Sequence, residues 1–196
     1  MLRTFHSYME TARGYRLAQF LGLPTIRRYR RLIQEHVLNK PGTRILEIGC
    51  GIGSFRHVFA GDYTGIDINP DYIRQARDRI SGNFQVMDAA DMSFAPGSFD
   101  EAVCVATGHH LSNEQLGAMI RKAVTVAPRL HLIDAVLPIS PNKWFKTMLF
   151  RMDRGQYIRT VEQLRDVVNR NARIESHQAI EGPLHDVCIF RVSRLI

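Results

Sequence analysis

The stretch from Arg44 to Phe55 contains the residue types and the spacing best suited to binding chemistry. One carboxylate, Glu47, interrupts an apolar run, and three glycines follow at alternate positions, namely Gly49, Gly51 and Gly53. The apolar run predicts a buried strand, and the glycines predict a tight turn in which the backbone closely approaches a ligand. Because glycine-rich strand-to-helix turns of α/β folds are common sites for nucleoside-bearing ligands, we expect such a ligand here.

A dinucleotide site is the first alternative for this turn. Its G-x-G-x-x-G fingerprint would place the third glycine where this chain has Ser54. Glu47 lies two residues before the first glycine, where a carboxylate repels a pyrophosphate and favours a cationic ligand. S-adenosylmethionine (SAM) carries both an ammonium and a sulfonium group. The other interpretation of Glu47 is a strand-end carboxylate bonded to backbone amides, which the cost of a charge within an apolar strand disfavours.

The nine residues from Ile45 to Gly53 resemble motif I of the class I SAM-dependent methyltransferases. The sequence downstream agrees with this resemblance. A second apolar segment ends near Asp67, 20 residues after Glu47, and a carboxylate at the end of a second strand can accept hydrogen bonds from both hydroxyls of a ribose. A helix-capping role for Asp67 is disfavoured, because Asn69 and Pro70 already supply a cap and a first-turn proline.

Two further segments are similar to the same family. The resemblance implies that Asp88, after a third strand, accepts a hydrogen bond from the adenine amino group, and that the Ala89 amide reaches a ring nitrogen. The Gly-Ser-Phe-Asp segment at 97–100 precedes a fourth strand, as in the family. The resemblance therefore covers residues 44–111 and implies SAM as methyl donor, with S-adenosylhomocysteine (SAH) as product. It also places three further residues beside the cofactor: Cys50, Ile68 and Val105.

The elements that must position these residues follow from the rest of the chain. The sequence predicts leader helices at 6–21 and 25–37, capping boxes that begin at Ser112 and Thr160, a strand at 129–136, and a terminal hairpin of strands 174–180 and 187–192. We expect an α/β, Rossmann-like class I methyltransferase fold with a seven-stranded, mostly parallel sheet, an antiparallel last strand and helices on both faces. A single domain, 1–196, would comprise a basic helical leader (1–44), a SAM-binding half (45–136) and an acceptor-side insertion with the terminal hairpin (137–196).

Composition narrows the class of protein further. No run of about 18 apolar residues is present, so no membrane-spanning helix is expected. Three widely separated cysteines predict buried thiols in the cytoplasm, without disulfides or a metal site. The net charge is +7, and the nine basic and two acidic residues of 1–44 account for all of that excess. The dense run at 27–31 suits a membrane surface, a nucleic acid or an anionic substrate, and a solvated basic helix face is the alternative.

The residues after the fourth strand are the candidates for catalysis. His109 and His110 are suited to accept a proton near neutral pH, and the alternative is that they only fix their loop by hydrogen bonding. The segment Thr107 to His110 lacks the Asn/Asp-Pro-Pro-Tyr/Phe motif of nucleic-acid amino-methyltransferases, so a nucleic-acid acceptor is disfavoured. A His-His-Leu triplet is common among the family's small-molecule enzymes, including those of quinone biosynthesis.

A later segment is the candidate for the acceptor pocket. Residues 143–152 alternate large apolar and cationic side chains and include the only tryptophan, Trp144. They suit a lid over the acceptor or a peripheral contact with anionic lipid, and a core helix is the alternative. Arg154, Tyr157 and Arg159 would offer cations and a hydroxyl to an anionic acceptor. We expect O-, N- or C-methylation of a small-molecule or lipid-like acceptor, with a non-catalytic SAM-binding protein as the alternative.

Overall fold

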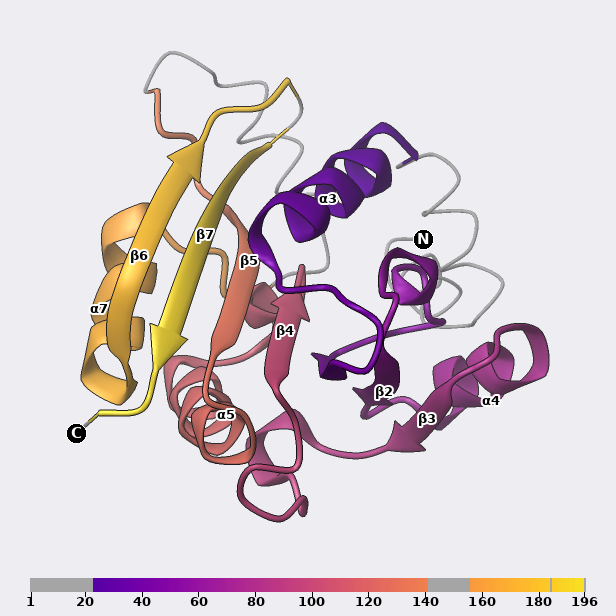
Figure 1. The fold of residues 1–196 in the computed structure, drawn as a ribbon. Helices are drawn as coiled ribbons and strands as arrows, with labels where there is room; N and C mark the ends of the chain where they lie inside the picture. The colour runs from indigo at the N-terminus through magenta and orange to yellow at the C-terminus, as the bar shows by residue number, and fades with distance from the viewer. Residues whose placement is uncertain (1–22, 141–155, 184, 196) are drawn as a thin grey trace.

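The structure, a computed structural model, describes residues 23–140, 156–183 and 185–195. Its strands are Arg44–Ile48 (β1), Asp62–Asp67 (β2), Asn83–Val86 (β3), Glu101–Val105 (β4), Leu130–Val136 (β5), Arg173–Ile180 (β6) and Asp186–Ser193 (β7). They form one seven-stranded sheet in the order β3-β2-β1-β4-β5-β7-β6 (Figure 1). The first five strands pair in parallel, and β7 is antiparallel to both of its neighbours, β5 and β6. This sheet confirms the predicted fold class, including the antiparallel last strand.

Among the described residues, four α-helices accompany the sheet: Leu23–His36 (α3), Pro70–Arg79 (α4), Asn113–Val126 (α5) and Val161–Asn171 (α7). Their starts are set by local side chains. Asn69 accepts hydrogen bonds from the first-turn amides of α4, and both predicted capping boxes form, with Ser112 at α5 and Thr160 at α7. The predicted second leader helix is α3, although it begins two residues earlier than expected. The predicted helix at 6–21 and the segment 143–152 lie outside the described residues.

The core lies on both faces of the sheet. On one face, α5 and α7 pack against the apolar side chains of β1, β4, β5 and β7, and on the other face α3 and α4 pack against a second apolar cluster. Strand alternation distributes β1 between the two clusters, because Leu46 and Ile48 belong to the first and Ile45 to the second. The alternation therefore directs Glu47, the one buried charged residue of β1, to the face of Ile45 and α3.

The segment after the glycine turn differs from expectation. The predicted strand-to-helix turn leads only into a three-residue 3-10 helix, Arg56–Val58 (η1). Eight residues, 54–61, separate Gly53 from β2, which leaves too little chain for an α-helix and a return to the start of the next strand. The Arg56 guanidinium supports this short connection by donating to the carbonyls of Phe59 and Ser81.

In the part of the chain that the structure describes, no helix combines the length and apolar character needed to cross a membrane.

Candidate active site

The glycine turn after β1 has a backbone that other residues do not readily adopt. Gly49, Gly51 and Gly53 have φ angles of +74°, +55° and +78°. The amides of Gly49 and Cys50 donate to the Ile66 carbonyl at 2.8 and 2.9 Å, so the turn is fixed to β2. A Cβ atom at Gly49 would collide with the side chain of Thr107. The turn is therefore held against the end of β4 as well, with an approach so close that only glycine fits.

Asp67 ends β2 beside this turn. Its two carboxylate oxygens accept hydrogen bonds from the amides of Gly51 and Asn69, each at 2.9 Å. Burial raises the pKa of Asp67, and these two amide donors oppose the rise. A carboxylate offers about four lone pairs, so it retains acceptor capacity for the hydroxyls of a bound ribose.

The neighbouring strand ends provide an apolar surface with a second acid. Ile68 is 68% exposed and Val86 is 49% exposed, although both are large apolar side chains. Val86 pairs with Asp67 in the β2–β3 register. Asp88 is exposed and uses one oxygen to cap the 3-10 helix Ala89–Asp91 (η2), at 2.8 Å from the Ala90 amide. Exposed apolar groups thus lie between two carboxylates at this edge, and Asp88 and the half-buried Ala89 follow β3. Their contacts with an adenine stay a prediction.

Two predicted cofactor residues have buried side chains. Cys50 and Val105 each expose 3% of their surface. Cys50 Sγ is directed to the Gly51 carbonyl, and burial raises the pKa of its thiol above the ordinary range. Their side chains therefore pack inside, and only their backbone atoms face the turn and the end of β4.

Glu47 lies beneath the glycine turn and not at its surface. It is 1% exposed, and its carboxyl accepts a 2.5 Å hydrogen bond from the Tyr63 hydroxyl. Burial raises its pKa to about 8, which the Tyr63 bond opposes and the nearby Asp67 charge reinforces. Near neutral pH the group is mostly protonated in this state, so the sequence argument from a fixed negative charge against pyrophosphate is weakened. A cation bound above the turn would favour the ionised form.

The carboxyl end of β4 closes the site. Ala106 has a φ of +50°. Among the described residues, it is the one non-glycine residue with a positive φ. Such a left-handed conformation in a residue with a Cβ stores strain and is concentrated at functional sites. The next residue, Thr107, donates its hydroxyl to the carbonyls of Gly49 and Val105, at 3.3 and 3.0 Å. The glycine turn and the start of the histidine loop are thus one connected structure.

The two candidate histidines lie in the 3-10 helix Gly108–His110 (η3), directly after this strand end. His109 is 5% exposed and its Nδ1 lies 2.5 Å from Asp134 Oδ1, whereas His110 is exposed. The two rings are neighbours, with centroids 4.2 Å apart. Sequence reasoning had not identified Asp134, because its part in the site depends on the pairing of β4 with β5.

Of the four predicted acceptor-side residues, the structure describes two. Trp144 and Arg154 lie outside the described residues. Tyr157 is exposed, and its amide donates to the His109 carbonyl at 3.0 Å. Arg159 is buried, and its guanidinium donates to the Asn113 side chain and to the carbonyls of Gly108, Tyr157 and Leu111. The expectation that Arg159 offers its charge to an acceptor is therefore wrong for this state, because its donors are used to hold the histidine loop.

Arg30 lies beside the glycine turn, and its sequence position did not single it out. Its Nη2 donates to the Ser54 carbonyl, just after the glycine turn, at 3.1 Å. Its Nε is buried and has no hydrogen-bond partner among the described residues. An arginine beside this turn suits the carboxylate of an amino-acid group. The basic run at 27–31 suited an anion, but the sequence did not indicate which of its arginines lies beside the glycine turn.

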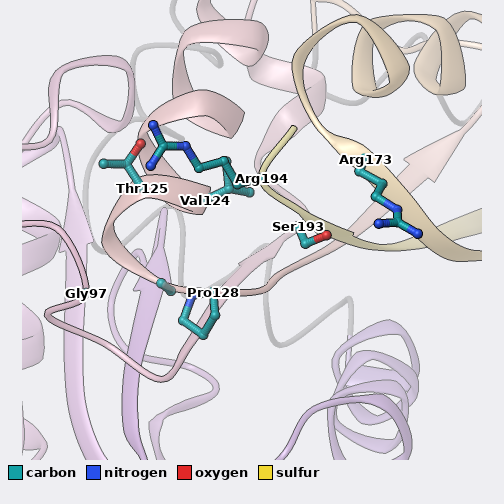
Figure 2. Close-up of a pocket in the computed structure, with 8 residues that line it drawn as sticks. Gly97, Val124, Thr125, Pro128, Arg173, Ser193 and Arg194 are labelled. Atoms are coloured by element: carbon teal, nitrogen blue, oxygen red, sulfur yellow. The ribbon is translucent and has the colours of Figure 1, made fainter. Parts of the chain in front are cut away.

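Another hollow lies away from this edge of the sheet. A depression of about 460 Å³ is lined at the amino ends of β4, β5 and β6 by Gly97, Pro128, Arg173 and neighbouring residues. Figure 2 shows the side chains of Arg173 and Arg194 directed away from each other, so they do not converge on one ligand. Within the described ranges, no group of three His, Cys, Asp or Glu side chains could hold a metal ion. The candidate site is therefore the carboxyl edge of the sheet.

Comparisons with known proteins show what part of this chain is similar to. Residues 45–128 match a family model described as a methyltransferase domain. The chain is similar to the 2-methyl-6-phytyl-1,4-hydroquinone methyltransferase of Synechocystis, with 37% identity over 86 residues, which cover 40% of this chain and 27% of that protein. It is also similar to the cyclopropane-fatty-acyl-phospholipid synthase of Escherichia coli, with 31% identity over 85 residues, which cover 41% of this chain and 22% of that protein. The matched part is thus about a quarter of each relative.

A solved structure supports the fold over a longer range. Magnesium protoporphyrin IX methyltransferase from Synechocystis with bound SAH aligns with a TM-score of 0.67 and 17% identity, over 100% of both chains. At this identity the similarity establishes the shared fold.

Proposed function

Because residues 45–128 belong to the class I SAM-dependent methyltransferase family, we propose that this chain transfers the methyl group of SAM to a small-molecule or lipid-like acceptor. One observation carries the proposal. The left-handed glycine turn, Asp67, Asp88 and the strained end of β4 lie along a single edge of the sheet, in positions that suit an amino-acid nucleoside. Asp67 is half-buried beside the glycine turn, and the exposed apolar side chains of Ile68 and Val86 lie next to it, which supports a ligand at this edge.

The residues of the chain would act mainly by binding and orientation. SAM supplies a methyl carbon that its sulfonium already activates, so the protein has to align the acceptor and exclude water. Asp67 and Asp88 suit the ribose and the adenine, and Arg30 suits the carboxylate. Thr107 joins the glycine turn to the histidine loop, so an acceptor held at η3 would lie beside the cofactor.

The acceptor that fits this edge is apolar with a polar or anionic end. Exposed Ile139 and Tyr157 flank the segment 141–155 at the same edge, beyond the end of β5. A 2-methyl-6-phytyl-1,4-hydroquinone methyltransferase and a cyclopropane-fatty-acyl-phospholipid synthase are among the relatives, and both names contain a compound with a long apolar part. We therefore place phenolic or quinol-type compounds and acyl lipids first among candidates.

The cofactor half of the proposal is tested by thermal melting with SAH and with SAM. At a hundred times the Kd, a ligand that binds only the folded state adds about 2.7 kcal/mol, or a rise in Tm of about 5–10 °C for a chain of this size. We expect that rise in the wild type and a much smaller one in Asp67→Asn. Asp91→Asn, which changes an exposed turn acid beside Asp88, is the matched control and should behave as the wild type. No rise in the wild type at excess ligand would refute SAM binding.

The acceptor half is tested by incubating the protein with SAM carrying a labelled methyl group and a panel of phenols, quinols, aromatic acids and acyl lipids. Label in an organic product supports methyl transfer and identifies the acceptor atom. A rise in Tm with SAH, without methyl transfer to any member of the panel, would favour the alternative, a SAM-binding protein without turnover. Label in RNA or DNA would instead favour nucleic-acid modification.

A further inference from the structure

The two adjacent histidines of η3 have opposite environments. His109 is 5% exposed, and His110 is exposed at the carboxyl edge of the sheet. A group that touches an acceptor has to reach the space that the acceptor enters. By that criterion the two side chains are not equivalent candidates, although they are neighbours in the sequence.

His109 is held from the inside of the molecule. Asp134, on β5, is 1% exposed, and its Oδ1 lies 2.5 Å from His109 Nδ1. The same oxygen accepts the Ala135 amide at 2.8 Å, which fixes the carboxylate on its strand. The His109 carbonyl accepts the Tyr157 amide. Both the ring and the backbone of His109 are thus bound to neighbouring elements, as expected of a supporting residue.

The loop that carries His110 is fixed on both sides. Arg159 donates to the carbonyls of Gly108 and Leu111, at 3.0 and 2.7 Å, one on each side of the histidine pair. Thr107 attaches the start of the loop to Gly49 in the glycine turn. His110 packs against the His109 ring, with centroids 4.2 Å apart and planes inclined by 43°. The position of the exposed ring is therefore set by a buried frame.

We propose that His110 is the imidazole that contacts the acceptor, and that Asp134 is a positioning residue that acts on it through His109. The inference rests on the proposed function, because it assumes an acceptor at this edge. For a hydroxyl or amine acceptor, its oxygen or nitrogen bonds to the methyl carbon while the carbon–sulfur bond breaks, and the electron pair of that bond stays on sulfur. The proton of the acceptor passes to His110.

Carbethoxylation by diethyl pyrocarbonate, followed residue by residue with tandem mass spectrometry, tests this division of roles. We expect His110 to react at least ten times faster than His109 in the wild type, and saturating SAH to slow His110 because the ligand covers this edge. In Asp134→Asn the His109 rate should rise towards that of His110, and SAH should protect His110 less. Asp91→Asn, away from the pair, is the control and should keep the wild-type rates.

The outcomes separate this inference from the proposed function. Equal rates in the wild type, or a His109 rate unchanged in Asp134→Asn, would overturn the inference even if SAH raises the Tm. A difference in rate without any SAH effect on Tm or on His110 would overturn the proposed function and, with it, the acceptor role of His110. If Asp134→Asn does not fold, the variant His109→Gln replaces it, because the side-chain amide of the introduced glutamine can still donate to Asp134. In that variant SAH should still protect His110, and loss of this protection would contradict the inference.

Discussion

Among single residues, Glu47 has the environment that sequence reasoning was least able to anticipate. The apolar run around it indicated a buried strand, and the motif indicated a ligand-binding carboxylate. Its actual partner is the hydroxyl of Tyr63, 16 positions away on the next strand. That contact depends on the β1–β2 register and on the face to which each side chain points, which the sequence of the motif alone does not specify. The resulting pKa of about 8 makes the residue a source of pH-dependent stability.

Glu47→Gln should remove a destabilising effect of rising pH. The pKa of Glu47 is about 8 in the folded state, against an ordinary value of 4.5 for a solvated glutamate carboxyl. Between these values the unfolded chain releases a proton that the folded protein retains, so stability falls as pH rises, by at most about 1.4 kcal/mol per pH unit, and levels off above pH 8. Glutamine cannot ionise, so the variant should gain roughly 2–4 kcal/mol relative to the wild type between pH 5 and 8.

Urea unfolding at several pH values measures this difference. Glu35→Gln, at an exposed position of α3, is the matched control and should stay within about 0.5 kcal/mol of the wild type at every pH. A free-energy difference between Glu47→Gln and the wild type that does not change from pH 5 to pH 8 would show that Glu47 ionises normally in the folded protein.

At the scale of elements, the helix starts were predictable and the long-range supports were not. Each helix cap bonds to an amide no more than three residues further along the chain, as Asn69, Ser112 and Thr160 show. Such a role can be predicted from a short stretch of sequence. The His109–Asp134 pair spans 25 positions, and Arg159 reaches Gly108 across 51. Such contacts require that strand order and loop path are already known. The residues expected to bind the cofactor lie in consecutive strand–turn segments, so the sequence could propose them. The contacts that Asp134 and Arg159 make with the histidine loop could not be proposed in that way.

The basic run of α3 shows the same limit. It was interpreted as a surface for anions, yet the Arg28 guanidinium donates to three carbonyls of the β6–β7 hairpin, those of His185, Ile180 and Glu181. Two of the four arginines at 27–31 are thus occupied by backbone, Arg28 at the hairpin and Arg30 at the glycine turn. Arg27 and Arg31 are exposed.

Arg28→Gln should therefore destabilise the protein, and Arg27→Gln should not. Loss of the guanidinium leaves carbonyls of the hairpin turn without their donor, at an expected total cost of about 1–3 kcal/mol. Arg27→Gln removes the same charge from the same helix at an exposed position and should stay within about 0.5 kcal/mol. Chemical denaturation of both variants gives the comparison. Equal stabilities of the two variants would mean that the hydrogen bonds from Arg28 to the hairpin contribute no measurable free energy of unfolding.

For the whole molecule, the class of fold was predictable because the alternation of strands and helices in an α/β chain permits few topologies. The order of the strands within the sheet was not predicted and comes from the structure. The one antiparallel strand could be placed because too few residues separate β6 from β7 for a parallel crossover. The charge distribution is the other global feature that composition revealed. The excess of +7 lies within residues 1–44. On α3, Arg28 and Arg30 donate to backbone carbonyls, whereas Arg27 and Arg31 are exposed.

We expect this exposed charge to give weak, salt-dependent binding to anionic vesicles. Each arginine near an anionic bilayer contributes about 1 kcal/mol, and the attraction is screened over about 10 Å at 0.1 M salt. In co-sedimentation at low salt, the double variant Arg27→Gln/Arg31→Gln should therefore bind about 30-fold more weakly than the wild type. Arg74→Gln/Arg79→Gln, with the same charge removed from exposed positions of α4, is the control and should lose much less. Equal loss in both double variants would assign the binding to net charge alone, and no binding of the wild type to anionic vesicles at low salt would exclude the bilayer as the partner of the basic leader.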